Sequence, residues 1–302
     1  MLKLNRLRVL DMICPLGIDE TEITFSWELQ ADRRAVIQED YQIDVFISGQ
    51  KIWSSELIKS DQSVAVPSLG LNLAPKTRYD WTVSVTSFSK EMDCTETASN
   101  SSWFETGFMS ENWMANWIEP DQIPTEPSKK LSLDEMGAIL HGKKEKFQSR
   151  DYHEFQPAQY LRLPFAIDEK IKKARVYASA HGVYRLLLNG RRVDDREFAP
   201  EFTAYDNFLM YQTYDISDHL IAGNNVIGVV LADGWWIGRL GMFGECCQYG
   251  STLGLILQVE IEYIDGRRDI ICSDQMRSSL GPIRYSDIFV GERYDANFEI
   301  SG

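Results

Sequence analysis

The sequence alternates between apolar and polar residues with a period of two, and this pattern constrains the fold more than any other feature. Clear stretches are 23–27 (ITFSW), 41–46 (YQIDVF) and 81–85 (WTVSV), with turn formers such as Ser48-Gly49 after them. Alternation of this kind buries one face of a strand and leaves the other in water, as in antiparallel sheets. Several short strands within about 100 residues predict a small β-sandwich.

Residues 73–79 (LAPKTRY) make this prediction more specific. Their pattern resembles a tyrosine corner, in which a Tyr hydroxyl bonds to upstream backbone where the chain crosses between sheets. The alternation then puts Trp81 and Val83 on the same face as Tyr79. We therefore expect residues 1–108 to form a fibronectin type III or immunoglobulin-like β-sandwich.

The alternation returns more strongly in the second half of the chain. Residues 174–188 lead into Asn189-Gly190, a strong hairpin signal because both positions of the turn need positive φ. Residues 255–263 alternate and then turn at Asp265-Gly266. One buried and one wet face are typical of an antiparallel sheet. We expect a second, larger β-sandwich over residues 119–302, of the jelly-roll or galactose-binding-like type.

Residues 109–118 form the predicted linker between the two sandwiches. A polar insertion near 121–150 follows and interrupts the β pattern. Ser132 and Glu135 have the spacing of a capping box, and the apolar residues after them could share one face of a helix. We expect a short surface helix there. The predicted fold class is therefore all-β, with two β-sandwiches.

Charge and hydropathy exclude several classes of function. The 302 residues carry 31 Lys and Arg against 45 Asp and Glu, a net charge of −14. A field of this sign repels phosphate backbones and anionic lipids, so we expect no nucleic-acid and no membrane partner, whereas a neutral sugar is compatible. No apolar run approaches the roughly 20 residues that span a bilayer. The N-terminal residues lack a signal-peptide pattern, which predicts a cytoplasmic protein.

The five cysteines are odd in number and have no repeating spacing. No CxxC or HExxH motif is present, so a zinc site is not expected. Cys246 and Cys247 are the only pair, and adjacent cysteines rarely bridge because the required geometry is hard to reach. Free thiols in a reducing compartment are the expected state, and no pattern in the chain requires a cofactor.

Residues 231–244 form the most unusual segment, because four glycines are interleaved with Trp235, Trp236 and Arg239 and form no regular element. Indole faces can stack on the C–H side of a pyranose, and an adjacent charged side chain can bond its hydroxyls. The alternative is that the large aromatics plug the end of the sandwich. Asp206-Asn207 also has two interpretations, the capping of a turn or the supply of oxygen ligands to calcium or a sugar.

Several segments resemble the N-terminal region of bacterial α-L-rhamnosidases in order and spacing, and the resemblance covers nearly the whole chain. The similar segments are 11–19 (DMICPLGID), 25–27 (FSW), 60–63 (SDQS), 103–107 (WFETG), 178–193 (ASAHGVYRLLLNGRRV), 198–215 (FAPEFTAYDNFLMYQTYD), 225–241 (NVIGVVLADGWWIGRLG) and 281–296 (GPIRYSDIFVGERYDA).

The resemblance implies a place in a glycoside hydrolase that releases terminal L-rhamnose with inversion, using acidic residues of a downstream (α/α)₆ barrel. The acid-bearing motif of that barrel, of the form DERxGW, does not occur here, and Asp287, Glu292 and Asp295 belong to the sandwich pattern. We therefore expect an N-terminal fragment without catalytic residues, inactive alone. Its partner would be the missing downstream catalytic domain, for which it would serve as scaffold and carbohydrate-binding module.

The expected ligand is a rhamnose-containing glycan or glycoside, bound on two loops that a jelly roll can bring to one end. Calcium could be held there by Asp206 and Asn207. A rival hypothesis is a stand-alone sugar-binding or adhesion protein without a catalytic parent. A pure scaffold would instead expose an apolar patch where partner domains dock. The predicted carbohydrate-binding residues are Tyr205, Asp206, Asn207, Trp235, Trp236 and Arg239.

Overall fold

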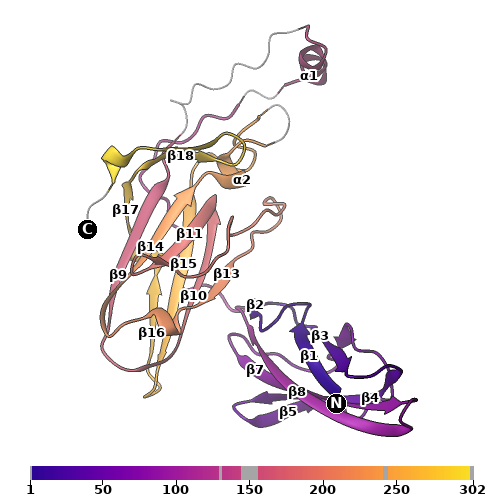
Figure 1. Cartoon of the computed structure of the whole chain (residues 1–302). Coiled ribbons are helices and arrows are strands. Elements are labelled where there is room, and N and C mark those ends of the chain that lie inside the picture. Colours follow the sequence, from indigo (N-terminus) through magenta and orange to yellow (C-terminus); the bar gives the residue numbers. More distant parts are fainter. Residues whose placement is uncertain (1, 129–130, 144–155, 241–243, 300–302) are drawn as a thin grey trace. The chain divides into compact units, whose positions relative to one another are not determined.

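The chain divides into two compact units, Met1–Asn112 and Trp113–Gly302. Strands make up nearly all of the regular structure in both units, which confirms the all-β class with two sandwiches. Within the described ranges, no helix is long and apolar enough to cross a bilayer. The computed structural model, shown in Figure 1, describes residues 2–128, 131–143, 156–240 and 244–299.

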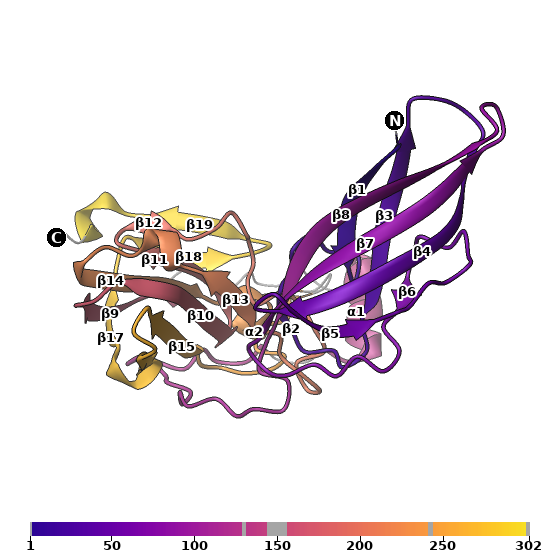
Figure 2. The same cartoon turned by 90° about the horizontal axis from the view of Figure 1, so that it is seen from below.

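The first unit has two sheets that enclose one apolar core (Figure 2). All strand pairs in both sheets are antiparallel except β2 with β8, which is parallel. The smaller sheet has the order β1 (Leu2–Val9), β3 (Thr24–Ala31) and β6 (Val66–Pro67). The larger sheet has the order β2 (Leu16–Ile18), β8 (Cys94–Thr106), β7 (Arg78–Ser89), β4 (Val36–Ile47) and β5 (Gln50–Ser54).

The tyrosine corner predicted from the sequence is present in this unit. The backbone N–H of Ala74 donates to the Tyr79 hydroxyl over 2.6 Å. The Tyr79 ring stacks on Phe104 with the ring centroids 4.9 Å apart. Trp81 and Val83 are buried on the same face of β7, as the alternation predicted. The bond holds the loop before β7 against the core, and it confirms the immunoglobulin-like interpretation.

The second unit is a sandwich of a four-stranded and a five-stranded sheet, with a separate hairpin of β18 (Ile283–Asp287) and β19 (Gly291–Tyr294). The four-stranded sheet has the order β13 (Gln212–Asp215), β10 (Ile171–His181), β15 (Gly254–Tyr263) and β16 (Arg268–Cys272). The five-stranded sheet has the order β12 (Arg191–Arg192), β11 (Val183–Leu188), β14 (Gly223–Ala232), β9 (Gln159–Ile167) and β17 (Arg277–Leu280). The helical elements are α1 (Leu133–Leu140), α2 (Gly234–Ile237), η2 (Ser217–His219), η3 (Ser273–Gln275) and η4 (Ala296–Phe298).

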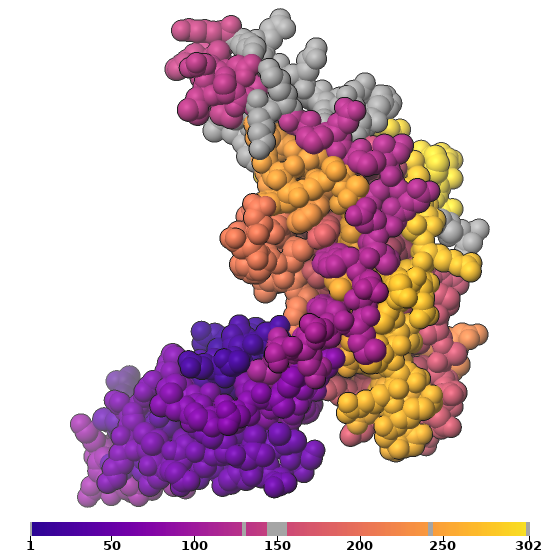
Figure 3. Space-filling view, turned by 180° about the vertical axis from the view of Figure 1, so that it is seen from behind, coloured from indigo at the N-terminus to yellow at the C-terminus, as the bar shows by residue number. Residues whose placement is uncertain are grey.

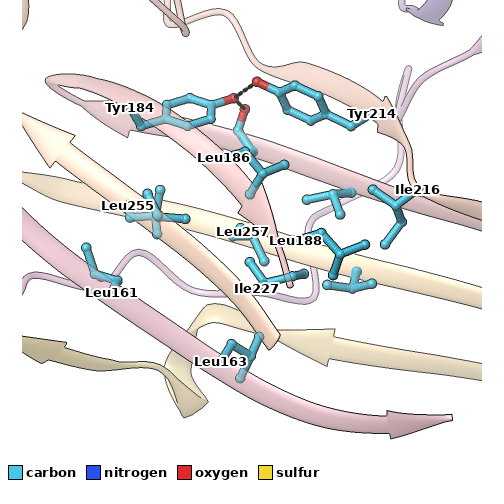
Figure 4. Close-up of a cluster of buried hydrophobic side chains, with 14 of the residues drawn as sticks. Leu161, Leu163, Tyr184, Leu186, Leu188, Tyr214, Ile216, Ile227, Leu255 and Leu257 are labelled. Atoms are coloured by element: carbon cyan, nitrogen blue, oxygen red, sulfur yellow. Dashed lines mark hydrogen bonds between the residues drawn. The ribbon is translucent and has the colours of Figure 1, made fainter. Parts of the chain in front are cut away.

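The two sheets of the second unit bury a mainly aliphatic core between them. Figure 4 shows Leu161 and Leu163 on β9 of one sheet. Leu255 on β15 of the other sheet is among the side chains that pack against them. Three buried tyrosines, Tyr184, Tyr214 and Tyr263, are exceptions. The Tyr214 hydroxyl donates to the Tyr184 hydroxyl over 3.0 Å, so each has a partner inside the core. Buried hydroxyls without such partners would be costly.

The chain passes from one sheet to the other at Gly182, between β10 and β11. This residue has φ +130°, and a Cβ built on it would lie 2.4 Å from the carbonyl oxygen of Ala232. Both facts require glycine. Residues 174–188 show one continuous β pattern in the sequence, yet the structure divides them between two sheets at this position.

The prediction that residues 231–244 form no regular element is wrong, because β14 ends at Ala232 and α2 begins at Gly234. Two other local signals in the second unit have the predicted outcomes. Asn189 and Gly190 have φ values of 51° and 78° and join β11 to β12, as the hairpin signal predicted. The capping box is formed at α1, where the Ser132 N–H donates to the Glu135 carboxylate over 2.9 Å and the Glu135 N–H donates to the Ser132 hydroxyl over 3.2 Å. Residues 129–130 and 144–150 of the predicted insertion lie outside the described residues.

The first residues of the second unit attach to β15. The backbone N–H groups of Met114 and Ala115 both donate to Oε1 of Gln258, over 2.7 and 3.1 Å. Ile118 then pairs with Leu255 through two backbone bonds of 2.9 Å. The segment predicted as a linker over 109–118 therefore has its last residues bonded into the sandwich.

Candidate functional site

Eight aromatic or imidazole rings gather around α2 and the ends of neighbouring strands of the second unit. We call them the aromatic cluster. They come from the segment before α1, the end of β10, the loop before β13, α2 and the loop before β15. The members are Trp117, His181, Phe198, Phe202, Tyr205, Trp235, Trp236 and Tyr249.

Three rings of the cluster form a continuous stack. His181 lies between Trp117, at 4.1 Å and 11°, and Trp236, at 4.0 Å and 5°. Burial lowers the pKa of His181, and the carboxylate of Glu119 opposes this shift. A Cβ on Gly250 would lie 2.2 Å from the indole nitrogen of Trp236, so the chain also approaches this ring closely. Trp236 is partly buried and packs against both a ring and the backbone, and this packing favours the plug interpretation over open stacking.

Trp235 is also partly buried, but it has different neighbours. Its ring centroid is 5.5 Å from that of Phe198 and 5.6 Å from that of Phe202. These two phenylalanines are 53% and 52% exposed, although each is a large apolar side chain. A half-buried indole flanked by two exposed rings presents an aromatic surface to solvent. Such a surface can stack on a sugar or another apolar face.

Tyr205 connects the two parts of the cluster. Its ring lies 5.5 Å from Trp236 and 4.9 Å from Tyr249. Burial raises the pKa of Tyr205 to about 12, and the neighbouring phenol of Tyr249 adds to the shift. The Tyr205 hydroxyl donates to the backbone oxygen of Glu201 over 2.8 Å. This phenol is consequently neutral at physiological pH and already has an acceptor.

Asp206 and Asn207 follow directly, and both are exposed. They sit in a turn closed by the Asn207 N–H, which donates to the Ala204 oxygen over 2.7 Å. The Thr203 hydroxyl donates to the Phe208 oxygen over 2.7 Å and braces the same turn. Among the described residues, no group of three or more His, Cys, Asp or Glu side chains is placed to hold a metal ion. Calcium at this turn would depend on the oxygens of Asp206 and Asn207 together with ligand or water.

Arg239 faces a different set of partners. Its backbone N–H donates to Oδ2 of Asp287 over 2.9 Å. The other carboxylate oxygen of Asp287 accepts the N–H groups of Phe289 and Val290, each over 2.9 Å. Asp287 thus ties the turn after α2 to the β18–β19 hairpin. Asp233, at the start of α2, is buried nearby, and burial followed by the charges of Asp287 and Cys246 raises its pKa to about 7.

The structure therefore brings Tyr205 and Trp236 into contact and leaves Asp206 and Asn207 exposed on the adjoining turn. Sequence reasoning missed several members of the cluster, because they come from other segments of the chain and meet the Trp pair only in the folded structure. Glycines beside two of them, Gly182 after His181 and Gly250 after Tyr249, are the local signals of close packing. The members missed are Trp117, His181, Phe198, Phe202 and Tyr249.

Comparison with known proteins shows which proteins this chain is similar to. A model described as "Alpha-L-rhamnosidase N-terminal domain" matches residues 169–302, and one described as "Rha78A-like, N-terminal immunoglobulin domain" matches residues 4–110. The chain matches the N-terminal region of α-L-rhamnosidases. An α-L-rhamnosidase of Formosa agariphila is 32% identical over 300 residues, covering 95% of this chain and 29% of that protein. One from Streptomyces avermitilis is 26% identical, covering 95% of this chain and 42% of that protein.

Solved α-L-rhamnosidase structures share the fold over the full chain. The enzyme of Aspergillus terreus superposes with a TM-score of 0.79 and 28% identity, covering 100% of this chain and 32% of its own. The Streptomyces avermitilis α-L-rhamnosidase, solved in complex with L-rhamnose, superposes with a TM-score of 0.80 and 24% identity, covering 100% of this chain and 43% of its own. The chain spans less than half of the length of these relatives.

Proposed function

We propose that this chain is the non-catalytic N-terminal part of an α-L-rhamnosidase and acts as a scaffold within it. The observation that carries this proposal is the match of both domain models, in order, together with superposition of the whole chain on solved α-L-rhamnosidases. The barrel motif that would supply the catalytic acids does not occur in the sequence. The purified chain should leave an aryl α-L-rhamnoside intact. Turnover that disappears when an acid of this chain is replaced would contradict the proposal.

The second unit also binds a rhamnose-containing glycan in this proposal. Trp235 supplies the stacking surface together with its exposed phenylalanine neighbours. Asp206 and Asn207 supply oxygens for sugar hydroxyls or for calcium. Tyr205 and Trp236 are packed against each other and position the turn rather than contact the ligand. A monosaccharide buries little surface, so we expect affinity in the millimolar range.

The binding part is tested by titrating L-rhamnose into the full chain, with and without calcium, and following NMR chemical shifts. Asp206→Ala should abolish the calcium-dependent shifts. Asp218→Ala, which removes another exposed carboxylate on η2, should leave them unchanged. Trp235→Ala should weaken binding, and Phe289→Ala, an exposed ring on the β18–β19 hairpin, is its control. Absence of shifts in the folded wild type at high sugar concentration would refute sugar binding while leaving the scaffold role standing.

The β18–β19 hairpin supports the scaffold role. Its turn carries Ile288, Phe289 and Val290, and the ring of Phe289 is 63% exposed. Because Asp287 bonds two N–H groups of this turn, the apolar side chains are presented on a fixed backbone. Exposed apolar groups of this kind mark surfaces that dock another domain. A dye that fluoresces on apolar surfaces should bind the chain and bind less to Phe289→Ser. Equal binding to both would contradict a docking role for this turn.

A further inference from the structure

Two adjacent thiols lie side by side next to the end of α2. Cys246 and Cys247 follow the turn after α2, and their sulfur atoms are 3.7 Å apart. Cys246 is buried and Cys247 is partly buried. Cys247 has a positive φ of 58°, a backbone conformation that residues other than glycine adopt infrequently. The backbone therefore holds both side chains on one side of the chain at a specific distance.

Backbone bonds on two sides fix the position of this pair. The Cys247 N–H donates to the oxygen of Ile237, the last residue of α2, over 2.7 Å. The Cys246 N–H donates to the hydroxyl of Ser128 over 3.2 Å. Leu240 and Glu245 are bridged across the base of the loop, with the Leu240 N–H donating over 2.8 Å. The pair is thus held between the end of α2 and the segment that precedes α1.

Oxygen atoms of that preceding segment surround the sulfurs. The Ser128 hydroxyl lies 3.1 Å from the sulfur of Cys246, and the Glu126 carbonyl oxygen lies 3.6 Å from it. The carbonyl oxygen of Thr125 lies 3.6 Å from the sulfur of Cys247. In the folded chain each thiol therefore donates to one of these carbonyl oxygens. Once the thiols have lost their protons, the same oxygens can face a bound ion.

The geometry separates two uses of such a pair. Adjacent Cα atoms are about 3.8 Å apart, below the roughly 4.4–6.8 Å usual for a disulfide, so a bridge would require backbone distortion. Two thiolates bound to one ion at about 2.3 Å in tetrahedral geometry lie about 3.8 Å apart. The observed separation of 3.7 Å agrees with the second arrangement. The thiols are already at the spacing that chelation requires.

We propose that Cys246 and Cys247 bind one thiophilic metal ion of the class of Cd²⁺, Zn²⁺ and Cu⁺ as a two-thiolate chelate. Each thiol loses its proton to solvent on binding, and oxygens of residues 125–128 or water take the other positions. Thiolates select such soft ions over Ca²⁺ and Mg²⁺. A zinc site was not expected from the sequence, because four-ligand motifs are missing. A chelate of two thiolates does not need such a motif. This site is independent of the sugar-binding proposal, which uses hard oxygen ligands on another loop.

The test is a titration of the fully reduced chain with Cd²⁺, followed by the ultraviolet charge-transfer absorption of thiolate–cadmium bonds. We expect one equivalent to bind, with affinity that rises with pH as the thiols deprotonate. Cys246→Ser and Cys247→Ser should each weaken binding about 100-fold, because the second thiolate binds intramolecularly once the first is bound. Cys272→Ser is the matched control, since it removes a partly buried thiol elsewhere, and it should leave the curve unchanged.

Circular dichroism establishes that each variant is folded, so a lost signal reports on binding. Equal affinity in the wild type and in Cys246→Ser and Cys247→Ser would overturn the proposal. Displacement of Cd²⁺ by Ca²⁺ at the same concentration would also overturn the proposal, since it would indicate a site made of hard oxygen ligands. Protein isolated without reductant is expected to retain both thiols. Two results together would show that the pair forms a disulfide instead. The first is a peptide containing Cys246 and Cys247 whose mass is lower by two hydrogens, and the second is no cadmium binding after reduction.

Discussion

We expect Asp233 to make the stability of the second unit depend on pH. Its carboxyl group is buried at the start of α2, and burial, with Asp287 and Cys246 adding, raises its pKa from 3.8 to about 7. Between these values the folded chain keeps the group neutral, whereas the unfolded chain ionises it in water. Because the folded pKa is above the unfolded one, the free energy of unfolding falls as the pH rises from about 4 through about 7.

The size of the effect follows from the shift. One pKa unit corresponds to 1.36 kcal/mol, so a shift of about three units corresponds to about 4 kcal/mol. This penalty is absent below about pH 4 and complete above about pH 7. Asp233→Asn keeps the shape of the side chain and removes the charge. We expect the difference in free energy of unfolding, variant minus wild type, to grow by about 4 kcal/mol between about pH 4 and pH 8.

The assay is urea unfolding followed by circular dichroism at a series of pH values for both proteins. Subtracting the free energy of unfolding of the wild type from that of the variant at each pH removes the contributions of groups that titrate identically in both proteins. Asp218→Asn is the control, because Asp218 is exposed on η2, and its difference from wild type should stay flat. A difference for Asp233→Asn that is flat across the same range would refute the reasoning.

Three further substitutions test packing described above, each by urea or thermal unfolding. Gly182→Ala should cost about 2–4 kcal/mol, because its φ is +130° and the new Cβ would meet the Ala232 oxygen at 2.4 Å. Tyr79→Phe should cost about 1–2 kcal/mol, since it removes the 2.6 Å bond from the Ala74 N–H. Trp236→Ala should cost about 3–5 kcal/mol, because the partly buried ring packs against His181, Tyr205 and Tyr249.

Each of these three substitutions has a matched control. Gly137→Ala adds a methyl group in open space inside α1 and should stabilise slightly. Tyr41→Phe removes a buried hydroxyl in the same unit as the tyrosine corner and should cost less than Tyr79→Phe. Trp235→Ala should cost less than Trp236→Ala because its ring is flanked by half-exposed neighbours. Equal losses within any pair would contradict the corresponding argument.

Much of the fold could be predicted because its signals are local. Strand alternation, the Asn189-Gly190 turn and the capping box at Ser132 each depend on residues a few positions apart, and each has the predicted geometry. The sheet change at Gly182 could not be predicted in the same way. The apolar pattern continues through it, and the need for glycine arises from the carbonyl of Ala232, which is 50 positions further along the chain.

The candidate site was less predictable, because its rings meet only in three dimensions. Trp235 and Trp236 attracted attention as a pair, yet the structure gives them different environments. The imidazole of His181 covers Trp236, whereas Trp235 lies among exposed phenylalanines. Adjacent residues on a short helix point in different directions, and only the distant partners determine what each ring packs against. A sugar-binding role for any of these rings is still a prediction.

The amide of Gln258 decides where the second unit can be separated from the first. This side chain is completely buried, and its oxygen is satisfied by the N–H groups of Met114 and Ala115. A chain trimmed to begin at Trp113 keeps both donors. A chain trimmed to begin at Asn116 would leave the amide oxygen without them in the interior, at a cost of about 1–3 kcal/mol. Gln258 on β15 therefore determines where an isolated second unit can begin, although this residue is far along the chain from the point of truncation.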